Sequence, residues 1–186
     1  MSPPKGERIF LKKRIFVLFL ALILVISCFC GCSNENEAET EINPDEFSYD
    51  MLDLSIVVNE IYKKLEITDL VKKSLVKVTD ETFVEEQYYL DLDNVVSYEI
   101  RYADGRYGTA DVAIIRVKEG KTEEVMSTLE NRKDDRINEF RNYDVYDSYS
   151  IAMNAEIYQE GELVIMLMLS EEDKISAKET INYYLP

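Results

Sequence analysis

The chain has 186 residues, with 37 acidic and 21 basic side chains, and it contains no histidine or tryptophan. Without histidine it can form neither a Ser-His-Asp triad nor an imidazole-based zinc site. Carboxylates, lysine, tyrosine and a Ser-Lys pair remain as catalytic groups, so the composition lowers the expectation of an enzyme. Residues 33–186 hold 16 basic and 36 acidic side chains, a net charge of −20 that repels phosphates and predicts no nucleic acid partner.

The N-terminal segment predicts export. Basic residues occur up to Arg14, an apolar run follows over residues 15–26, and small residues then lead into cysteine. The basic part stays on the cytoplasmic side, while the apolar run enters the bilayer and a peptidase cuts before a cysteine. We therefore predict a lipoprotein signal peptide over residues 1–31. A retained anchor helix is the alternative, although residues 15–29 fall short of the roughly 20 that a bilayer-spanning helix needs.

Cys32 is the predicted lipidation site, and Cys28 is the alternative. The residues before Cys28 resemble a bacterial lipobox well, whereas Cys32 is preceded by Phe29 where leucine is usual. Cys32 stands directly before a polar run and leaves no apolar residue in the segment that follows. The lipobox resemblance implies a diacylglycerol thioether that anchors the chain in membrane lipid. Residues 32–48, rich in glutamate and asparagine, predict a flexible acidic tether at the extracytoplasmic face of the cell membrane.

The rest of the chain, residues 49–186, is long enough for a single domain with one core. All three cysteines lie in the first 32 residues, so disulfides do not hold this domain together. Helical spacing and capping residues predict helices over residues 49–66, 81–89, 122–142 and 171–184. Alternating or continuous apolar residues predict strands over residues 96–102, 109–118, 151–157 and 163–169.

This order predicts an α+β fold with a four-stranded, largely antiparallel sheet made of two strand-strand-helix units. The two N-terminal helices pack on the sheet. The continuous apolar run at residues 163–169 predicts a central strand that is covered on both faces. Residues 104–108 contain two glycines and predict the most exposed hairpin tip of the domain.

Three tyrosines, Tyr143, Tyr146 and Tyr149, lie three residues apart beside Asp144 and Asp147. Aromatic rings beside carboxylates can bind sugars or cell-wall peptides, so these tyrosines are candidate binding residues. The structural alternative, which we favour, is a connector that crosses a sheet edge and buries each ring while its hydroxyl reaches water. The sequence predicts no catalytic residue, metal ligand or cofactor.

Two segments carry a family resemblance: AIIRVKEGKTEEV at residues 113–125 and IAMNAEIYQEGELVIMLMLS at residues 151–170, with the connector 136–145 between them. They resemble a family of small exported lipoproteins from Gram-positive anaerobes that carry a domain of unknown function. Tyr143 and Gly161 match its connector tyrosine and its hairpin glycine. The resemblance implies this fold and an extracytoplasmic location, and it implies no activity.

These patterns predict a membrane-anchored extracytoplasmic lipoprotein with a non-catalytic binding domain. Its predicted partner is an envelope protein or a cell-wall polymer. The main alternative is a carboxylate-dependent hydrolase that acts on cell-wall glycan or peptide, and a third is a structural part of a surface or spore-envelope assembly. A deep cleft holding two acids with raised pKa would favour the hydrolase, whereas a flat or convex acidic surface would favour binding.

Overall fold

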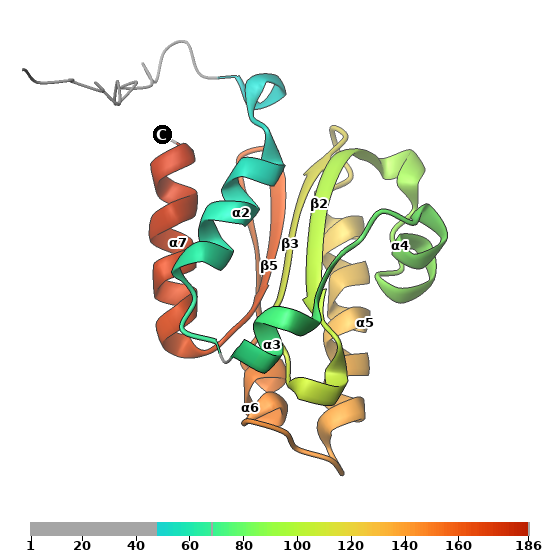
Figure 1. The fold of residues 1–186 in the computed structure, drawn as a ribbon. Coiled ribbons are helices and arrows are strands. Elements are labelled where there is room, and N and C mark those ends of the chain that lie inside the picture. Colours follow the sequence, from blue (N-terminus) through green and yellow to red (C-terminus); the bar gives the residue numbers. More distant parts are fainter. Residues whose placement is uncertain (1–47, 68, 186) are drawn as a thin grey trace, which may run out of the picture. The chain divides into compact units, whose positions relative to one another are not determined.

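The computed structural model describes residues 48–67 and 69–185 (Figure 1). The predicted signal peptide, both candidate lipidation sites (Cys32 and Cys28) and the predicted tether up to residue 47 lie outside these residues. Within the described part of the chain, no helix is long and apolar enough to cross a membrane.

The described residues form an α+β fold with a five-stranded sheet, all of whose strand pairs are antiparallel. In spatial order the strands are β1 (Leu75–Lys77), β2 (Val95–Ala103), β3 (Asp111–Val117), β5 (Leu163–Met168) and β4 (Glu156–Glu160). The helices are α2 (Leu54–Lys64), α3 (Asp69–Ser74), α4 (Glu81–Gln87), α5 (Thr122–Phe140), α6 (Ser148–Met153) and α7 (Glu171–Tyr184). Short 3₁₀ turns lie at Tyr49–Met51, Leu92–Asn94 and Gly105–Tyr107.

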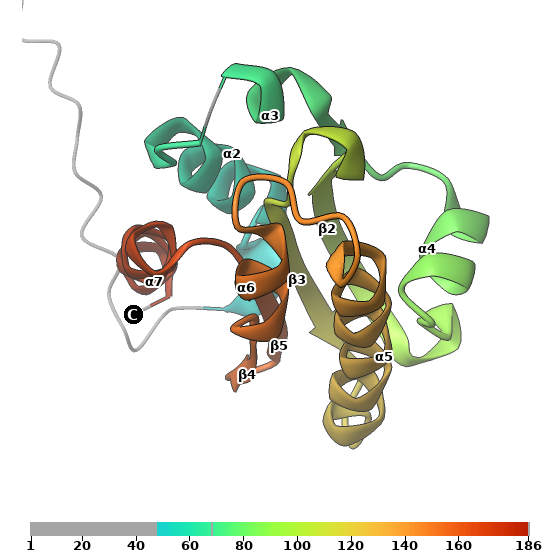
Figure 2. The same cartoon turned by 90° about the horizontal axis from the view of Figure 1, so that it is seen from below.

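Helices cover both faces of the sheet, with α2 and α7 on one face and α4 and α5 on the other (Figures 1 and 2). Ile114 of β3 and Ile165 of β5 point into the core under α2 and α7. Ile115 and Met166, one residue further along, point into the core under α4 and α5. Strands β3 and β5 are buried along their whole length because both of their faces are covered.

The two predicted strand-strand-helix units are present as β2-β3-α5 and β4-β5-α7. They meet where β3 pairs with β5 at the centre of the sheet, from Asp111 opposite Met168 to Arg116 opposite Leu163. The prediction of a central, doubly covered strand at residues 163–169 is therefore confirmed. Helix α7 begins where its predicted cap Ser170 accepts a hydrogen bond from the backbone N–H of Asp173.

One predicted strand is partly wrong, since residues 151–155 do not extend the strand that follows them. Helix α6 occupies Ser148–Met153, and β4 begins only at Glu156. The apolar residues Ile151, Ala152 and Ala155 fit a helical turn followed by a bend as well as they fit an alternating strand, and packing against α5 decides between them. Short apolar runs are ambiguous in this way.

The sequence prediction also missed α3 and β1, and therefore the fifth strand. Strand β1 has only three residues, too few to show alternation, and it pairs at the sheet edge, where Leu75 lies opposite Ala103. The first helix begins at Leu54 rather than at residue 49. Asp53 caps it by accepting a hydrogen bond from the backbone N–H of Ser55 at 2.9 Å.

Two local details differ from the predicted pattern. The register of β2 against β3 shifts between Val95 and Ser97, so Val95 enters the core while Val96 is 53% exposed. The connection after β2 is not a fully exposed tip, because Gly108 and Thr109 are buried there. Helix α3 packs against this connection.

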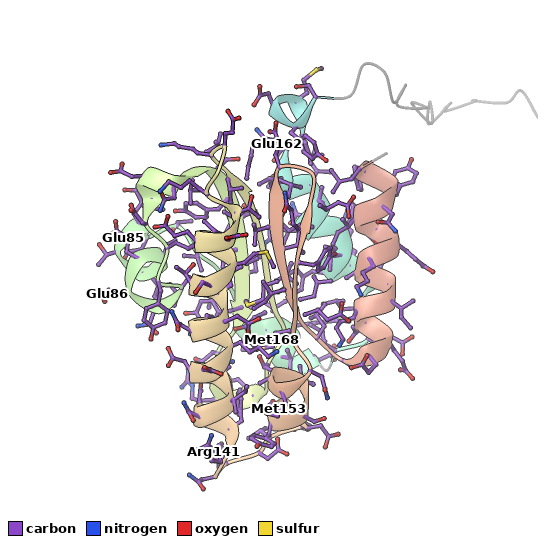
Figure 3. The ribbon with its side chains drawn as sticks, turned by 180° about the vertical axis from the view of Figure 1, so that it is seen from behind. Glu85, Glu86, Arg141, Met153, Glu162 and Met168 are labelled. Atoms are coloured by element: carbon purple, nitrogen blue, oxygen red, sulfur yellow. The ribbon has the colours of Figure 1, made fainter. Side chains whose placement is uncertain are left out.

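The sheet has two distinct ends. Figure 3 shows Glu162, in the β4–β5 turn, at one end, and Met153 and Arg141 at the opposite end. The first described residues lie at the Glu162 end, since a Cβ atom added to Gly161 would be 1.6 Å from the hydroxyl oxygen of Tyr49. The described part of the chain thus begins at the β4–β5 turn.

Candidate functional site

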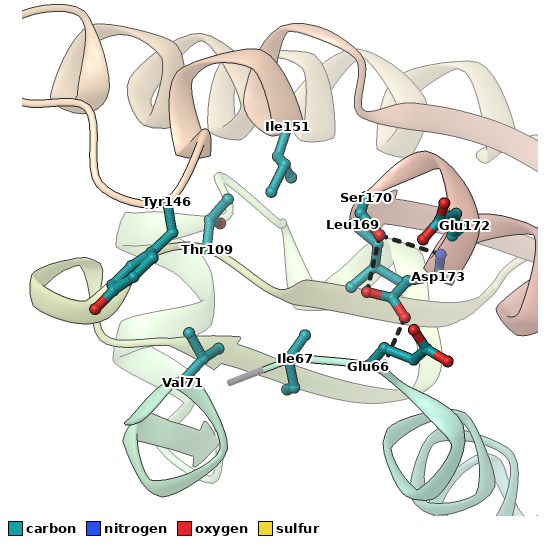
Figure 4. A pocket seen from close by; sticks show the side chains of 11 residues that line it. Glu66, Ile67, Val71, Thr109, Tyr146, Ile151, Leu169, Ser170, Glu172 and Asp173 are labelled. Atoms are coloured by element: carbon teal, nitrogen blue, oxygen red, sulfur yellow. Dashed lines mark hydrogen bonds between the residues drawn. The ribbon is translucent and has the colours of Figure 1, made fainter. Parts of the chain in front are cut away.

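A pocket of about 280 Å³ lies at the end of the sheet that is opposite the β4–β5 turn (Figure 4). Ile67, Val71, Ile151 and Leu169 form its apolar walls. These residues are far apart in sequence. They meet because β3 begins and β5 ends at the same end of the sheet, where α3, α6 and α7 also lie.

One end of the pocket is acidic and is formed at the start of α7. The Ser170 hydroxyl donates a hydrogen bond to Oδ2 of Asp173 at 2.9 Å, and it accepts one from the Asp173 backbone N–H at 3.1 Å. Oδ1 of Asp173 accepts a hydrogen bond from the backbone N–H of Glu66 at 2.9 Å. The arrangement is a variant of the capping box, and it also ties the chain after α2 to the start of α7 (Figure 4).

Asp173 is only 5% exposed, whereas Glu66 and Glu172 beside it are exposed. All three carboxylates line the pocket. Among the described residues, none of the three has a lysine or arginine nitrogen within 4.0 Å. The acidic end therefore carries negative charge that the described protein leaves without a cation.

The opposite end of the pocket holds Tyr146 (Figure 4). Its side chain is 58% exposed, and its backbone φ of +52° is in the left-handed region, followed by Asp147 at +59°. Left-handed backbone at a non-glycine residue is uncommon and often occurs at binding sites. The two residues turn the chain into α6 and place the tyrosine ring at the pocket.

Of the three tyrosines predicted to bind, Tyr146 alone lines this pocket. Tyr143 is 66% exposed and Tyr149 is partly buried, and neither contributes to its lining. Tyr143 and Tyr146 therefore do not bury their rings as the structural alternative supposed. As binding residues, all three tyrosines remain predictions.

A buried ion cluster lies behind the pocket and is joined to it by Thr109. The Thr109 hydroxyl donates a hydrogen bond to Oδ1 of Asp111 at 3.1 Å and accepts one from Nη2 of Arg136 at 3.3 Å. Oδ2 of Asp111 lies 3.3 Å from Nη2 of Arg132 and 3.4 Å from Nε of Arg136. The backbone N–H of Ala103 donates a further bond to Asp111 at 3.3 Å.

The cluster joins α5 to the sheet. The Arg132 guanidinium lies 4.8 Å from the ring centre of Tyr88, whose pKa is raised by burial, and Arg136 lies 4.8 Å from that of Phe140. Asp111 has no exposed surface and does not line the pocket. We assign the cluster a structural role.

Sequence reasoning missed this cluster, although a signal for it was present. The buried stripe of α5 runs from Val125 and Leu129 through Arg132 and Arg136 to Phe140. The two arginines therefore occupy core positions of a regular helical pattern. A buried arginine pair requires a buried acid, and the apolar strand β3 contains one at its first residue.

The described carboxyl groups with a shifted pKa are all shifted downward. Hydrogen bonds from Ser55, Arg106, Lys121 and Lys178 are the largest cause of the lowered pKa at Asp53, Asp104, Glu124 and Glu156, respectively. None of these four acids lines the pocket. Within residues 48–67 and 69–185, no group of three acids is arranged to hold a metal ion.

A second, larger groove of about 570 Å³ lies along the turns at the other end of the sheet. Its charged side chains, Lys118, Glu119 and Glu162, are exposed, and its lining includes no aromatic ring. The pocket at Asp173 and Tyr146 combines a buried charge, an aromatic side chain and apolar walls. We therefore take it as the candidate binding site.

These features define a small α+β domain with an open, partly acidic pocket. A family model described as "Domain of unknown function (DUF4358)" matches residues 69–169, which is more than half of the chain. The chain belongs to this family, which confirms the predicted resemblance to a domain of unknown function, while the Gram-positive source and the lipoprotein character stay predictions. The matched residues include the whole sheet and the Tyr146 side of the pocket, while Glu66 and Asp173 lie outside them. Comparisons with curated proteins and with solved structures gave no match.

Proposed function

We propose that this chain is a membrane-anchored lipoprotein of the extracytoplasmic face whose domain binds an envelope protein or cell-wall polymer without chemistry of its own. The observation that carries the proposal is the pocket of about 280 Å³ with apolar walls and an acidic end. Sites for whole small-molecule substrates are commonly about 300–1,000 Å³. A pocket at the lower limit of this range fits one side chain or one end group of a larger partner.

The acids of the pocket also favour binding. Both oxygens of Asp173 already accept hydrogen bonds, one from the Ser170 hydroxyl and one from the backbone N–H of Glu66, and these bonds hold the carboxylate in the helix cap. A glycoside hydrolase needs one carboxyl that is protonated near neutral pH, opposite a second that is ionised. No specific observation among the described residues favours that arrangement, so the hydrolase is not proposed.

The position of the pocket supports a tethered receptor. Tyr49 packs at the β4–β5 turn, and the pocket lies at the opposite end of the sheet (Figure 3). A tether that enters at residue 48 therefore joins the domain far from the pocket. A partner can then reach the pocket while the chain is anchored.

Metabolic labelling with palmitate tests the anchor. We expect label in the natural protein and in Cys28→Ala, and no label in Cys32→Ala. Loss of label in Cys28→Ala alone would show that Cys28, and not Cys32, is the lipidated residue. An unlabelled natural protein would overturn the lipoprotein proposal.

Site-specific photo-cross-linking in intact cells tests the binding proposal. A photoreactive amino acid in place of Tyr146, which is 58% exposed, is compared with the same group in place of Tyr183, which is 66% exposed and lies outside the pocket. We expect a discrete adduct from position 146 and none from position 183. Equal labelling from both positions, or none from either, would contradict a partner at the pocket.

A cell-wall digestion assay separates binding from the hydrolase alternative. Incubation of the purified protein with isolated cell wall should release no soluble fragments. Fragment release that is lost in Glu172→Gln would instead establish hydrolysis.

A further inference from the structure

We propose that the pocket binds an organic ammonium group carried on an alkyl stem, as in a lysine side chain or a free diamine. The ammonium lies against Glu66, Glu172 and Asp173, and the stem follows the apolar walls toward Tyr146. This inference rests on the proposed binding function and names the chemistry of the group that is bound.

The first step of the argument is the buried carboxylate of Asp173. Moving an ionised carboxylate out of water is unfavourable unless a cation or hydrogen-bond donors replace the water. The protein supplies two donors, the hydroxyl of Ser170 and the backbone N–H of Glu66, to an anion with about four acceptor positions. The start of α7 adds a favourable field. Acceptor capacity at this buried charge thus remains for an incoming donor.

The second step is that the ammonium groups of the two lysines near the acidic end bind other partners. Lys64, at the end of α2, donates to the Thr180 hydroxyl at 3.0 Å. Lys174, the residue after Asp173, donates to the backbone carbonyl of Asn154 and to Glu171, both at 2.8 Å. Both cations are held away from the pocket. The described elements beside the acidic end therefore leave its charge open to a cation from outside.

The third step is the apolar wall between the acids and Tyr146. Ile67, Ile151 and Leu169 line the path between the two ends (Figure 4). A bare inorganic cation would gain nothing from these side chains, whereas an alkyl stem would be removed from water by them. The volume of about 280 Å³ equals that of roughly nine water molecules, which is enough for a chain of several carbons. The carboxylates, the apolar walls and the Tyr146 ring together favour an alkylammonium ligand over an inorganic cation.

Isothermal titration of the full chain in non-ionic detergent tests the proposal with four probes of matched length. These are 1-pentylamine, 1,5-diaminopentane, 1-pentanol and pentanoate. We expect saturable binding of both amines and at least tenfold weaker binding of the alcohol and of the acid. The affinity for alkylamines should rise about fourfold for each added methylene until the stem fills the pocket. Equal binding of amine and alcohol, or no binding of either amine, would overturn the proposal.

Variants locate the binding. Glu66→Gln with Glu172→Gln changes two exposed side chains and should weaken amine binding at least tenfold. Glu179→Gln removes one charge from an exposed position of α7 outside the pocket and should leave binding unchanged. Ile151→Ala should remove most of the dependence on stem length. A double glutamine variant that binds amines like the natural protein would contradict the assignment.

The same titration distinguishes two sources of the ammonium group. A tighter dissociation constant for the tripeptide Ala-Lys-Ala than for 1,5-diaminopentane would assign the pocket to a peptide side chain. The reverse order would assign it to a free amine. If no amine binds but a discrete adduct still forms from position 146, the proposal of an ammonium ligand is wrong, whereas the proposal that the pocket binds a partner stands. Failure of both experiments would overturn the proposed function as well.

Discussion

Two buried carboxylates at the same end of the sheet have opposite surroundings. Asp111 has no exposed surface and lies within 3.4 Å of guanidinium nitrogens of both Arg132 and Arg136. Asp173 is 5% exposed, and its hydrogen bonds come from neutral groups of Ser170 and Glu66. Thr109 stands between the two regions, since its hydroxyl binds Asp111 and its side chain lines the pocket.

The difference shows that the protein compensates the two buried carboxylates in different ways. A carboxylate that joins α5 to the sheet is neutralised by the protein itself, because an unpaired charge at that depth would be strongly destabilising. A carboxylate at the pocket needs less compensation, because a helix N-terminus and two donors stabilise it. Because these donors are neutral, the Asp173 carboxylate keeps its negative charge and can bind a ligand cation. Substitutions at the two sites should therefore differ in size and in kind.

Asp111→Asn should give the largest loss of stability, about 3–5 kcal/mol in the free energy of unfolding. The variant keeps the shape of the side chain but leaves the buried guanidinium group of Arg132 without its counter-charge, and it leaves Arg136 only its ion pair with Glu139. Urea unfolding measures the loss. Asp104→Asn is the matched control, because the pair between Asp104 and Arg106 is exposed and such pairs contribute little. Equal unfolding midpoints for the two variants would contradict the structural role of Asp111.

Removing one arginine from the Asp111→Asn variant should restore part of the loss. In the double variant with Arg132→Met, Arg136 keeps its ion pair with Glu139, and the methionine can pack beside Tyr88. We expect a recovery of roughly 1–2 kcal/mol relative to Asp111→Asn alone. A double-mutant cycle in urea measures it. Purely additive losses would show that Arg132 and Asp111 stabilise the fold independently.

Ser170→Ala should cost about 1 kcal/mol, which is typical for the loss of a helix cap. The substitution removes the hydroxyl that Asp173 binds and the acceptor for the first turn of α7. Thermal unfolding measures the change, with Ser176→Ala in the interior of α7 as the control. The pocket carboxylates stay in place, so the affinity for 1-pentylamine should change less than the stability does. A loss as large as that of Asp111→Asn would contradict the comparison.

Sequence patterns predicted the parts of the fold that local regularity controls. Helix α5 and helix α7 are long and have acidic residues in their first turns, and the strands of the two hairpins flank turns that contain glycine. Helix α6 and strand β1 have six residues or fewer, so their local pattern is overruled by contacts with α5 and β2. Short elements depend on tertiary packing that one sequence does not display.

The candidate site was less predictable than the fold. Tyr146 was identified from its aromatic and acidic neighbours, and it lies at the pocket. Asp173 was visible only as part of an acidic first turn, and Glu66 only as the end of a helix. They become one site because the backbone after α2 contacts the start of α7, more than a hundred residues later in the chain. No spacing in the sequence predicts this contact.

Glu156→Gln should give the smallest effect, and the effect should depend on pH. Glu156 forms ion pairs with Lys174 and Lys178, and the hydrogen bond from Lys178 lowers its pKa below the ordinary 4.5. A lowered pKa in the folded state contributes stability above the unfolded-state pKa, and the contribution disappears as the pH falls through the folded value. Because the side chain is 37% exposed, screening limits this to a few tenths of a kcal/mol. Urea unfolding at pH 7 and pH 3 should show Glu156→Gln less stable than Glu179→Gln at pH 7, with a smaller difference at pH 3. A difference that does not shrink between pH 7 and pH 3 would mean that packing of Glu156, and not its charge, supports β4.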